Sequence, residues 1–316
     1  MNPTTIATVQ RWFASAYGQE SARVVRSASR TSGGLFQLAH DEGTSWLRVG
    51  GVLSRTAVEV EAEGRAAAEL VKSGVSVAAP LRRADGAFGG SMVVDGESLP
   101  TIAYAEVEGE RVAMPTPEQA SRLGEVVGAL HRCGNDQHGL PVVEPLARIN
   151  ECIASASKWI DAEDARWLRS TVHRQSTALH DLEPNARTTC HGDLQLSNAH
   201  FVGDSPTLLD LEGLGVGPPA YDCACMWRKR VLENGFSSPT DWLFFKQGYE
   251  RTTDVTEDHW RALPAFAVVR AVWTMSLPAL PNAAWGVDWV RDPDYWRAHF
   301  RMVRWFADFA ATGESA

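Results

Sequence analysis

The residues with the clearest chemical potential stand in two short polar segments beyond the middle of the chain. Asp193 and Asn198 lie five positions apart in the loop-like segment His-Gly-Asp-Leu-Gln-Leu-Ser-Asn, and Asp210 follows twelve positions later at the end of an apolar run. Phosphoryl transfer uses a carboxylate that orients and deprotonates a hydroxyl, together with oxygen ligands that hold Mg²⁺ on a nucleotide. Each of these residues alone is also typical of a turn, but the combination predicts a small-molecule kinase.

Two short apolar segments connect these polar residues. Residues 201–202 and 208–209 are apolar, and the segment Gly-Asp-Ser-Pro at 203–206 has the composition of a hairpin turn. A hairpin at this place would bring Asn198 and Asp210 to the same end of two paired strands. A shared metal ion would have to lie at that end.

The rest of the chain divides into a strand-rich N-terminal region and a mostly helical C-terminal region. The expected strands lie at 24–25, 35–38, 45–49, 91–94 and 101–104, and the expected helices lie at 5–17, 56–72, 116–131 and 163–182 and over most of 220–312. A Glu- and Gly-rich break at 105–115 predicts a linker. The sequence therefore predicts an α+β fold with domains at 1–105 and 106–316.

Composition excludes several classes of function. A net charge of −9 argues against nucleic acid as a partner, and no apolar run approaches the roughly 18 residues of a membrane span. The N-terminus lacks the pattern of a signal peptide, and the five cysteines, an odd number with only one close pair, favour reduced thiols and a cytoplasmic protein. His131, Cys133 and His138 are too few ligands to predict a zinc site.

The motifs resemble those of the aminoglycoside phosphotransferase and choline kinase superfamily. The resemblance rests on His-Gly-Asp-Leu, the following Asn, Leu-Asp-Leu-Glu, Gly-Pro-Pro and Tyr-Asp within 191–222. It implies a two-lobed, protein-kinase-like fold with a small β-rich N-terminal lobe and a larger helical C-terminal lobe. It also implies Asp193 as catalytic base, Asn198 and Asp210 as Mg²⁺ ligands, and His191 and Asp222 as structural support of the catalytic loop.

The same resemblance predicts a nucleotide site for ATP or GTP in the N-terminal region. Arg48 occupies the position of a strand residue, often Lys in the family, that contacts phosphates and pairs with a helix Glu. Glu63 is the best match for that Glu, with Glu59, Glu61 and Glu69 as rivals. The remaining predicted contacts are a tight turn over the phosphates and backbone hydrogen bonds to the base, from Gly33, Gly34, Ala105 and Val107.

The acceptor site is predicted from the last quarter of the chain, which holds seven of the twelve tryptophans. Most of these are expected in the core. Trp285, Asp288 and Trp289 combine aromatic rings with a carboxylate, which suits a cationic acceptor such as an aminoglycoside-like antibiotic. Arg270 would instead suit the carboxylate of a substrate, so the two interpretations predict opposite acceptor charges.

Three alternatives stay open beside this hypothesis. The acceptor can be a hydroxylated amino acid or an amino alcohol, homoserine- or choline-like. The unusual Arg48 is compatible with a non-catalytic nucleotide-binding pseudokinase. A hydrolase with Cys190 as nucleophile is disfavoured, because Cys190 and His191 are adjacent and neighbouring strand residues point to opposite faces.

Overall fold

The structure is a computed structural model that divides into two units. It describes residues 3–30, 33–51, 55–133, 139–147, 149–182, 187–237, 239–279 and 288–313. Unit 1 comprises Met1–Ala113, Asn135–Pro141 and Ser197–Gly215, and unit 2 comprises Met114–Gly134, Val142–Leu196 and Val216–Ala316. The segment Ser197–Gly215 therefore groups with the N-terminal part of the chain, whereas the division predicted at residue 105 placed it in the C-terminal lobe.

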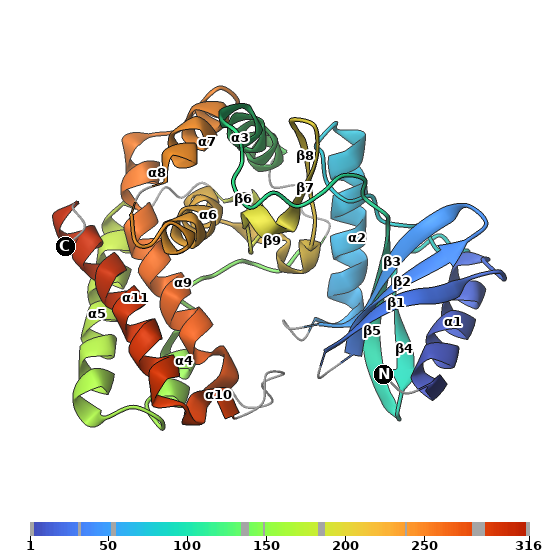
Figure 1. Ribbon diagram of the computed structural model, residues 1–316, viewed down its shortest axis with the longest axis horizontal. Helices are drawn as coiled ribbons and strands as arrows, with labels where there is room; N and C mark the ends of the chain where they lie inside the picture. The colour runs from blue at the N-terminus through green and yellow to red at the C-terminus, as the bar shows by residue number, and fades with distance from the viewer. Residues whose placement is uncertain are drawn as a thin grey trace. The chain divides into compact units, whose positions relative to one another are not determined.

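Unit 1 is built on a five-stranded antiparallel sheet with the order β1-β2-β3-β5-β4 (Figure 1). Its strands are β1 (Arg23–Arg30), β2 (Gly33–His40), β3 (Gly43–Gly50), β4 (Gly89–Val94) and β5 (Glu97–Ala105). Its helices are α1 (Pro3–Tyr17) and α2 (Ala57–Lys72). The predicted small sheet with an inserted helix is confirmed.

Strand alternation decides which side chains of β3 face which helix. Leu47 and Val49 pack with Val9 and Phe13 of α1 in one apolar cluster. Arg48, one position away, therefore points to the other face of the sheet, where it meets α2. A polar residue between two core residues is thus directed towards a helix instead of the α1 core.

Helix α2 begins and ends where its sequence predicts. Thr56 and Glu59 form a capping box, in which each side chain accepts a hydrogen bond from the other residue's backbone N–H. The helix ends with Ser73 as its C-cap, and the next residue, Gly74, has a φ of 82°, which suits a residue without a Cβ.

A second, two-stranded sheet explains why the segment 197–215 belongs to unit 1. Strands β7 (Ala199–Val202) and β8 (Ser205–Leu208) form the predicted hairpin. Leu208 pairs in parallel with Val77 after α2: the Ala78 N–H donates to the Leu208 carbonyl at 2.8 Å, and the Leu208 N–H donates to the Ser76 carbonyl at 2.9 Å. These hydrogen bonds fix the hairpin to the N-terminal part of the chain.

Unit 2 is mostly helical. Its helices are α3 (Pro117–Arg132), α4 (Ile149–Ala156), α5 (Ala162–Leu182), α6 (Pro219–Glu233), α7 (Thr240–Glu250), α8 (Glu257–Arg261), α9 (Leu263–Ser276), α10 (Asp288–Arg291) and α11 (Pro293–Thr312). The short strands β6 (Thr188–Cys190) and β9 (Gly215–Gly217) pair with each other. The predicted helix start at Thr116 is confirmed as a capping box with Gln119.

Helix α9 forms the centre of unit 2. It packs against α4, α5, α6 and α11, and Figure 1 shows it between α6 and α11. The stretch Glu257–Ala279, which includes α9, is long and apolar enough to cross a membrane by length and composition. However, 72% of its most apolar 18-residue segment is buried within the structure. That burial is the property of a core helix.

Candidate active site

An ion pair between β3 and α2 lies at the centre of unit 1. Arg48 Nη1 donates to Glu63 Oε1 at 2.9 Å and Arg48 Nη2 donates to Glu63 Oε2 at 2.7 Å, and both residues are buried. This is the two-pronged geometry that arginine forms with a carboxylate and lysine cannot. The structure thus joins the two residues that the sequence resemblance had matched.

Tyr104 on β5 completes this cluster. Its hydroxyl donates to Glu63 Oε1 at 2.6 Å. Burial by itself would lower the pKa of Arg48, but the charge and hydrogen bonds of Glu63 outweigh it, so that the pKa of Arg48 is raised. Arg48 is therefore a permanent cation held by Glu63, and Glu63 is in turn held by Tyr104.

The rival glutamates of α2 have other roles. Glu59 caps the helix, and Glu61 Oε2 accepts the N–H groups of Phe88 and Gly89 at 2.7 Å each. Glu69 forms an exposed pair with Lys72. Only Glu63 among the four therefore directs its carboxylate to Arg48.

The prediction that Gly33 and Gly34 form the turn between β1 and β2 is wrong. Strand β2 begins at Gly33, which pairs with Arg30, and Gly34 pairs with Ser29. The connecting residues 31–32 lie outside the described residues. The strands continue further than the glycines indicated, because Gly33 and Gly34 pair with β1 on one side and with β3 on the other.

The backbone predicted to contact the base follows β5. The Ala105 N–H donates to the Ala79 carbonyl at 2.9 Å and the Glu106 N–H donates to the Thr44 carbonyl at 3.0 Å. The Val107 carbonyl lies 3.4 Å from the His200 ring nitrogen Nδ1. The Ala105 N–H is therefore occupied.

The hairpin β7–β8 brings Asn198 and Asp210 together at one end. Ala199 pairs with Leu208, and the Leu209 N–H donates to the Asn198 carbonyl at 2.8 Å. Asn198 is buried and Asp210 is exposed. Asp210 has a φ of 54° and a ψ of 60°, a left-handed conformation that is uncommon for a residue with a side chain and is typical of functional sites.

In unit 2, the loop that carries Asp193 is anchored to α6 by Asp222. The N–H of His191 donates to Asp222 Oδ2 at 2.5 Å, and the N–H of Gly192 donates to Oδ1 at 2.8 Å. Gly192 has a φ of 78°, so a side chain there would strain the loop. Burial opposes the charge on Asp222, but the hydrogen bond and charge of His131, with those of the loop, lower its pKa.

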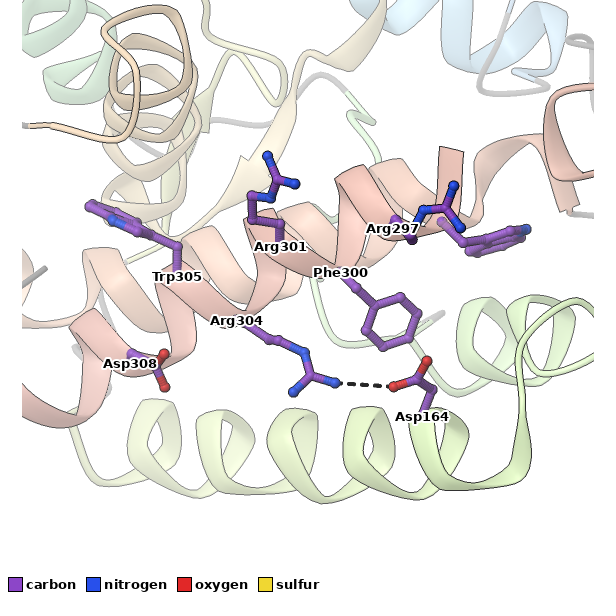
Figure 2. A pocket seen from close by; sticks show the side chains of 8 residues that line it. Asp164, Arg297, Phe300, Arg301, Arg304, Trp305 and Asp308 are labelled. Atoms are coloured by element: carbon purple, nitrogen blue, oxygen red, sulfur yellow. Dashed lines mark hydrogen bonds and ion pairs between the residues drawn. The ribbon is translucent and has the colours of Figure 1, made fainter. Parts of the chain in front are cut away.

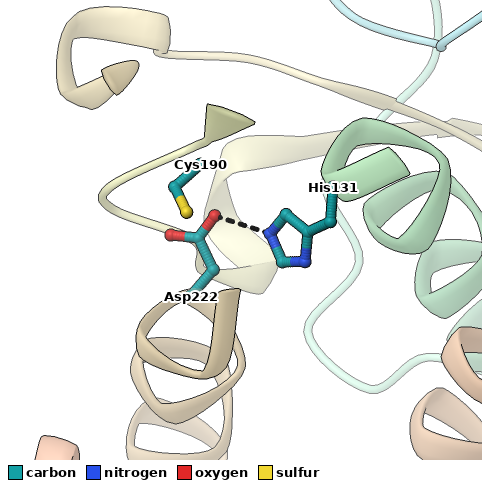
Figure 3. A group of neighbouring side chains, drawn as sticks. All are labelled: His131, Cys190 and Asp222. Atoms are coloured by element: carbon teal, nitrogen blue, oxygen red, sulfur yellow. Dashed lines mark hydrogen bonds and ion pairs between the residues drawn. The ribbon is translucent and has the colours of Figure 1, made fainter. Parts of the chain in front are cut away.

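His131, Cys190 and Asp222 each place one potential metal-ligand atom within 4.8 Å of the other two (Figure 3). His131 is hydrogen-bonded through Nε2 to Asp222 at 3.1 Å and through Nδ1 to the Tyr249 hydroxyl at 2.7 Å, and Cys190 Sγ donates to the Gly217 carbonyl at 3.3 Å. Each ligand atom thus has a protein partner, and three ligands fall short of the usual zinc set. We interpret the cluster as structural, because Asp222 connects His131 of α3 to the backbone of the loop that carries Asp193.

Cys190 does not fit the role of a nucleophile. It is fully buried, and burial raises the pKa of its thiol well above the usual value. Because the thiolate is the reactive form, this environment opposes the hydrolase alternative.

The Asp193 carboxylate is held by two side chains and stays partly open to solvent. Gln195 Nε2 donates to Asp193 Oδ1 at 2.6 Å, and Arg270 Nη2 donates to the same oxygen at 2.5 Å. The Asp193 side chain is 36% exposed. Arg270 also donates to the Tyr221 hydroxyl at 3.0 Å, and its guanidinium lies 4.2 Å from the centre of the Trp273 ring.

The neighbours of the Asp193 carboxylate are only partly those expected from the sequence. Arg270, which is predicted from the sequence as a ligand for a substrate carboxylate, directly contacts Asp193. Gln195 and Tyr221 both lie within the quoted motifs, but neither is given a role from the sequence; Gln195 contacts Asp193, and Tyr221 contacts Arg270. Trp285 lies outside the described residues, and of Asp288 and Trp289 the structure describes only that they begin α10.

A surface cavity of about 580 Å³ lies between α5 and α11 (Figure 2). Trp296, Phe300 and Trp305 line it together with arginines of α11, and Arg304 pairs with Asp164 at 3.1 Å. None of the predicted site residues lines this cavity. The cavity therefore shares no lining residue with the side chains that contact Asp193.

Known proteins resemble this chain over most of its length. A model of the Phosphotransferase enzyme family matches residues 36–266. The chain is 30% identical to an uncharacterized protein of Deinococcus radiodurans over 255 residues, which cover 76% of this chain and 72% of that protein. It is 26% identical to a homoserine kinase of Sinorhizobium fredii over 209 residues, which cover 63% of this chain and 61% of that protein.

A solved structure shares the fold. The amicoumacin kinase hAmiN, in complex with AMP-PNP, Ca²⁺ and Ami, superposes with a TM-score of 0.73 at 16% identity, covering 96% of this chain and 93% of that one. The predicted α+β, kinase-like architecture, with a β-rich N-terminal region and a helical C-terminal region, is confirmed. The chain therefore belongs to the phosphotransferase enzyme family, and it is a phosphotransferase with the fold of the small-molecule kinases.

Proposed function

We propose that the protein transfers the γ-phosphoryl group of ATP, or GTP, to a hydroxyl of a small-molecule acceptor. The observation that carries this proposal is the Asp193 carboxylate, which is partly exposed on a loop fixed by two backbone hydrogen bonds to Asp222. A general base must be positioned before it can accept a proton in the transition state. The family match supplies the reaction class.

Unit 1 supplies the groups for the nucleotide in this proposal. Arg48 uses one N–H of each terminal nitrogen for Glu63, and its remaining N–H groups are suited to phosphate oxygens. The base would bind along Ala105–Val107. Since the Ala105 N–H donates to Ala79, Ala105 can offer its carbonyl, and Val107 can offer its N–H.

Mg²⁺ fits the residues at the end of the β7–β8 hairpin. The Asp210 carboxylate is exposed, does not cap the following turn, and forms no hydrogen bond or ion pair with the described residues. A free carboxylate beside an amide is a donor set that hard cations prefer. Asp210 and Asn198 would hold the ion, which would neutralise charge on the phosphates.

Asp193 accepts the proton of the acceptor hydroxyl in this mechanism. Gln195 and Arg270 both donate to Oδ1, which fixes the rotation of the carboxylate. His191 supports the loop through its own N–H to Asp222 and by accepting the Asp193 N–H at 3.3 Å on Nδ1.

The acceptor is a small hydroxylated molecule, and the described surroundings of Asp193 carry the cation Arg270. This favours a hydroxylated amino acid over a cationic acceptor such as an aminoglycoside or an amino alcohol. The homology to a homoserine kinase supports the same choice. We place the protein in the cytoplasm, because all five cysteines are free thiols and nucleoside triphosphates are the proposed co-substrates.

The test is nucleotide consumption with Mg²⁺ over a panel of hydroxy amino acids, amino alcohols and aminoglycosides, with products identified by mass. Asp193→Asn should lower turnover about 10²–10⁴-fold with an unchanged fold by circular dichroism. Asp210→Asn, which tolerates the left-handed backbone, should weaken Mg²⁺-nucleotide binding. Undiminished turnover in Asp193→Asn contradicts the assignment, and nucleotide binding without product on any acceptor favours a pseudokinase.

A further inference from the structure

Arg228 on α6 is a buried cation without a carboxylate partner. It is 5% exposed, its Nε has no hydrogen-bond partner, and its Nη1 reaches only the Met302 sulfur at 3.4 Å. No carboxylate among the residues that the structure describes forms an ion pair with it. Buried arginines are normally paired, because an uncompensated charge in the interior is costly.

The neighbours of Arg228 do not supply the missing negative charge. Cys225 lies one turn and Tyr221 two turns before Arg228 on the same face of α6. Burial keeps both groups neutral, because it raises the pKa of Cys225 to about 12 and also raises the pKa of Tyr221. His299 on α11 is also neutral, since burial lowers its pKa. These three side chains therefore do not compensate the charge of Arg228.

A second cation lies close by. Arg270 contacts Tyr221 at 3.0 Å, and its Nε, like that of Arg228, is buried without a partner. Burial, followed by the charge of Arg270, lowers the pKa of Arg228 to about 10. The two arginines therefore repel each other in the structure as it stands.

The nearby carboxylates are already engaged. Asp193 accepts hydrogen bonds from Arg270 and Gln195, and Asp222 accepts from His131 and from two backbone N–H groups. Asp193 thus contacts Arg270, and among the described residues no carboxylate contacts Arg228. An anion that bound Arg228 would compensate its charge, and one that also reached Arg270 would lie beside the proposed catalytic base, because Arg270 contacts Asp193.

We propose that Arg228, together with Arg270, binds a carboxylate of the acceptor, so that the substrate is a small molecule with both a hydroxyl and a carboxylate. The inference rests on the proposed function, because it places the carboxylate of the same molecule whose hydroxyl meets Asp193. A guanidinium pair suits a carboxylate through bidentate, charge-assisted hydrogen bonds. Acceptors that carry only positive charge would add to the existing repulsion.

The experiment compares acceptors that differ only in the carboxylate. L-Homoserine is matched with 3-aminopropan-1-ol, and L-serine with ethanolamine, in each case the same hydroxy amine without the carboxylate. The measured quantities are kcat/KM and calorimetric affinity. The wild type should prefer the carboxylated member of at least one pair by roughly 10- to 100-fold, the range of a charge-assisted hydrogen bond.

Arg228→Met should reduce that preference by a similar factor, mainly through KM, while Arg228→Lys should retain part of it. Arg166→Met, an exposed arginine of α5, is the matched control and should keep the preference. Without acceptor, Arg228→Met should raise Tm, since it removes an unpaired buried charge at similar volume. A residue with a merely structural role would give a lower Tm and equal losses on both members of a pair.

The outcomes separate this inference from the proposed function. Equal kcat/KM for both members of each pair in the wild type, or a preference unchanged in Arg228→Met, overturns the carboxylate site while the kinase assignment stands. If no acceptor is phosphorylated, the proposed function fails, and the calorimetric binding measurement still tests the carboxylate site. Binding of a carboxylated member that is lost in Arg228→Met then supports the site, and no binding by any carboxylated member overturns it.

Discussion

The buried pair of Arg48 and Glu63 offers the sharpest test of the unit 1 geometry. The perturbation is a double-mutant cycle with Arg48→Met, Glu63→Leu and the double variant. Methionine and leucine approximate the volumes of the original side chains and carry no charge. Each single variant leaves one buried charge alone, whereas the double variant leaves none.

The magnitude follows from burial and distance. Arg48 is 6% exposed and Glu63 is 2% exposed, and the two hydrogen bonds measure 2.9 and 2.7 Å. Breaking such a pair from one side costs about 3–5 kcal/mol in the free energy of unfolding. The Glu63→Leu variant should lie at the upper end, because among the described residues Arg48 forms an ion pair with Glu63 alone. Arg48→Met should lie at the lower end, because Tyr104 still donates to Glu63. The double variant should cost about 1 kcal/mol or less.

Urea unfolding with linear extrapolation measures these values, and calorimetry measures nucleotide affinity in parallel. Tyr104→Phe serves as a control that removes one hydrogen bond and should cost about 1 kcal/mol. Nucleotide affinity should fall at least tenfold in Arg48→Met and in the double variant alike, since both lack the proposed phosphate ligand. If the two single costs add to that of the double variant within about 0.5 kcal/mol, the residues are not coupled and the reasoning is refuted.

Two further predictions concern unit 2. Asp222→Asn replaces a carboxylate that accepts two backbone N–H groups by an amide with one oxygen. It should therefore destabilise the protein by about 3 kcal/mol and speed hydrogen exchange at His191 and Gly192. Unchanged exchange at these two amides would contradict the anchoring role. His259 is buried with Nε2 unpaired, and burial, followed by the charges of His131 and Lys246, lowers its pKa to about 3. Because the unfolded chain takes up this proton near pH 6.5 and the folded chain does not, stability should fall by about 1.4 kcal/mol per unit as pH drops below that value. Urea unfolding at pH 7.5 and 5.5 measures the change, and the free energy of unfolding should fall less between these pH values in His259→Phe than in the wild type. An equal fall in both proteins would exclude His259 as its source.

Local features of the site could be predicted from the sequence because they depend on neighbours along the chain. The hairpin that joins Asn198 to Asp210 follows from two apolar segments around a Gly-Asp turn. The cap of α2 at Thr56 and the alternation that turns Arg48 away from the α1 core likewise need only residue types and spacing. The limits of such reasoning appear at Gly33, where composition indicates a turn and the strand pairing continues.

Contacts between distant segments were decided only by the tertiary structure. Four glutamates of α2 have similar local sequence, and their different partners follow from which side of the helix meets β3, the 88–89 backbone or solvent. Arg270 lies 77 residues after Asp193 in the chain and contacts it. The burial of Arg228 without a counter-charge depends on the packing of α6, α9 and α11. Residue types and spacing determined which chemistry this chain can perform, and packing determined which charges face each other, because electrostatic pairing depends on distance in space and on burial.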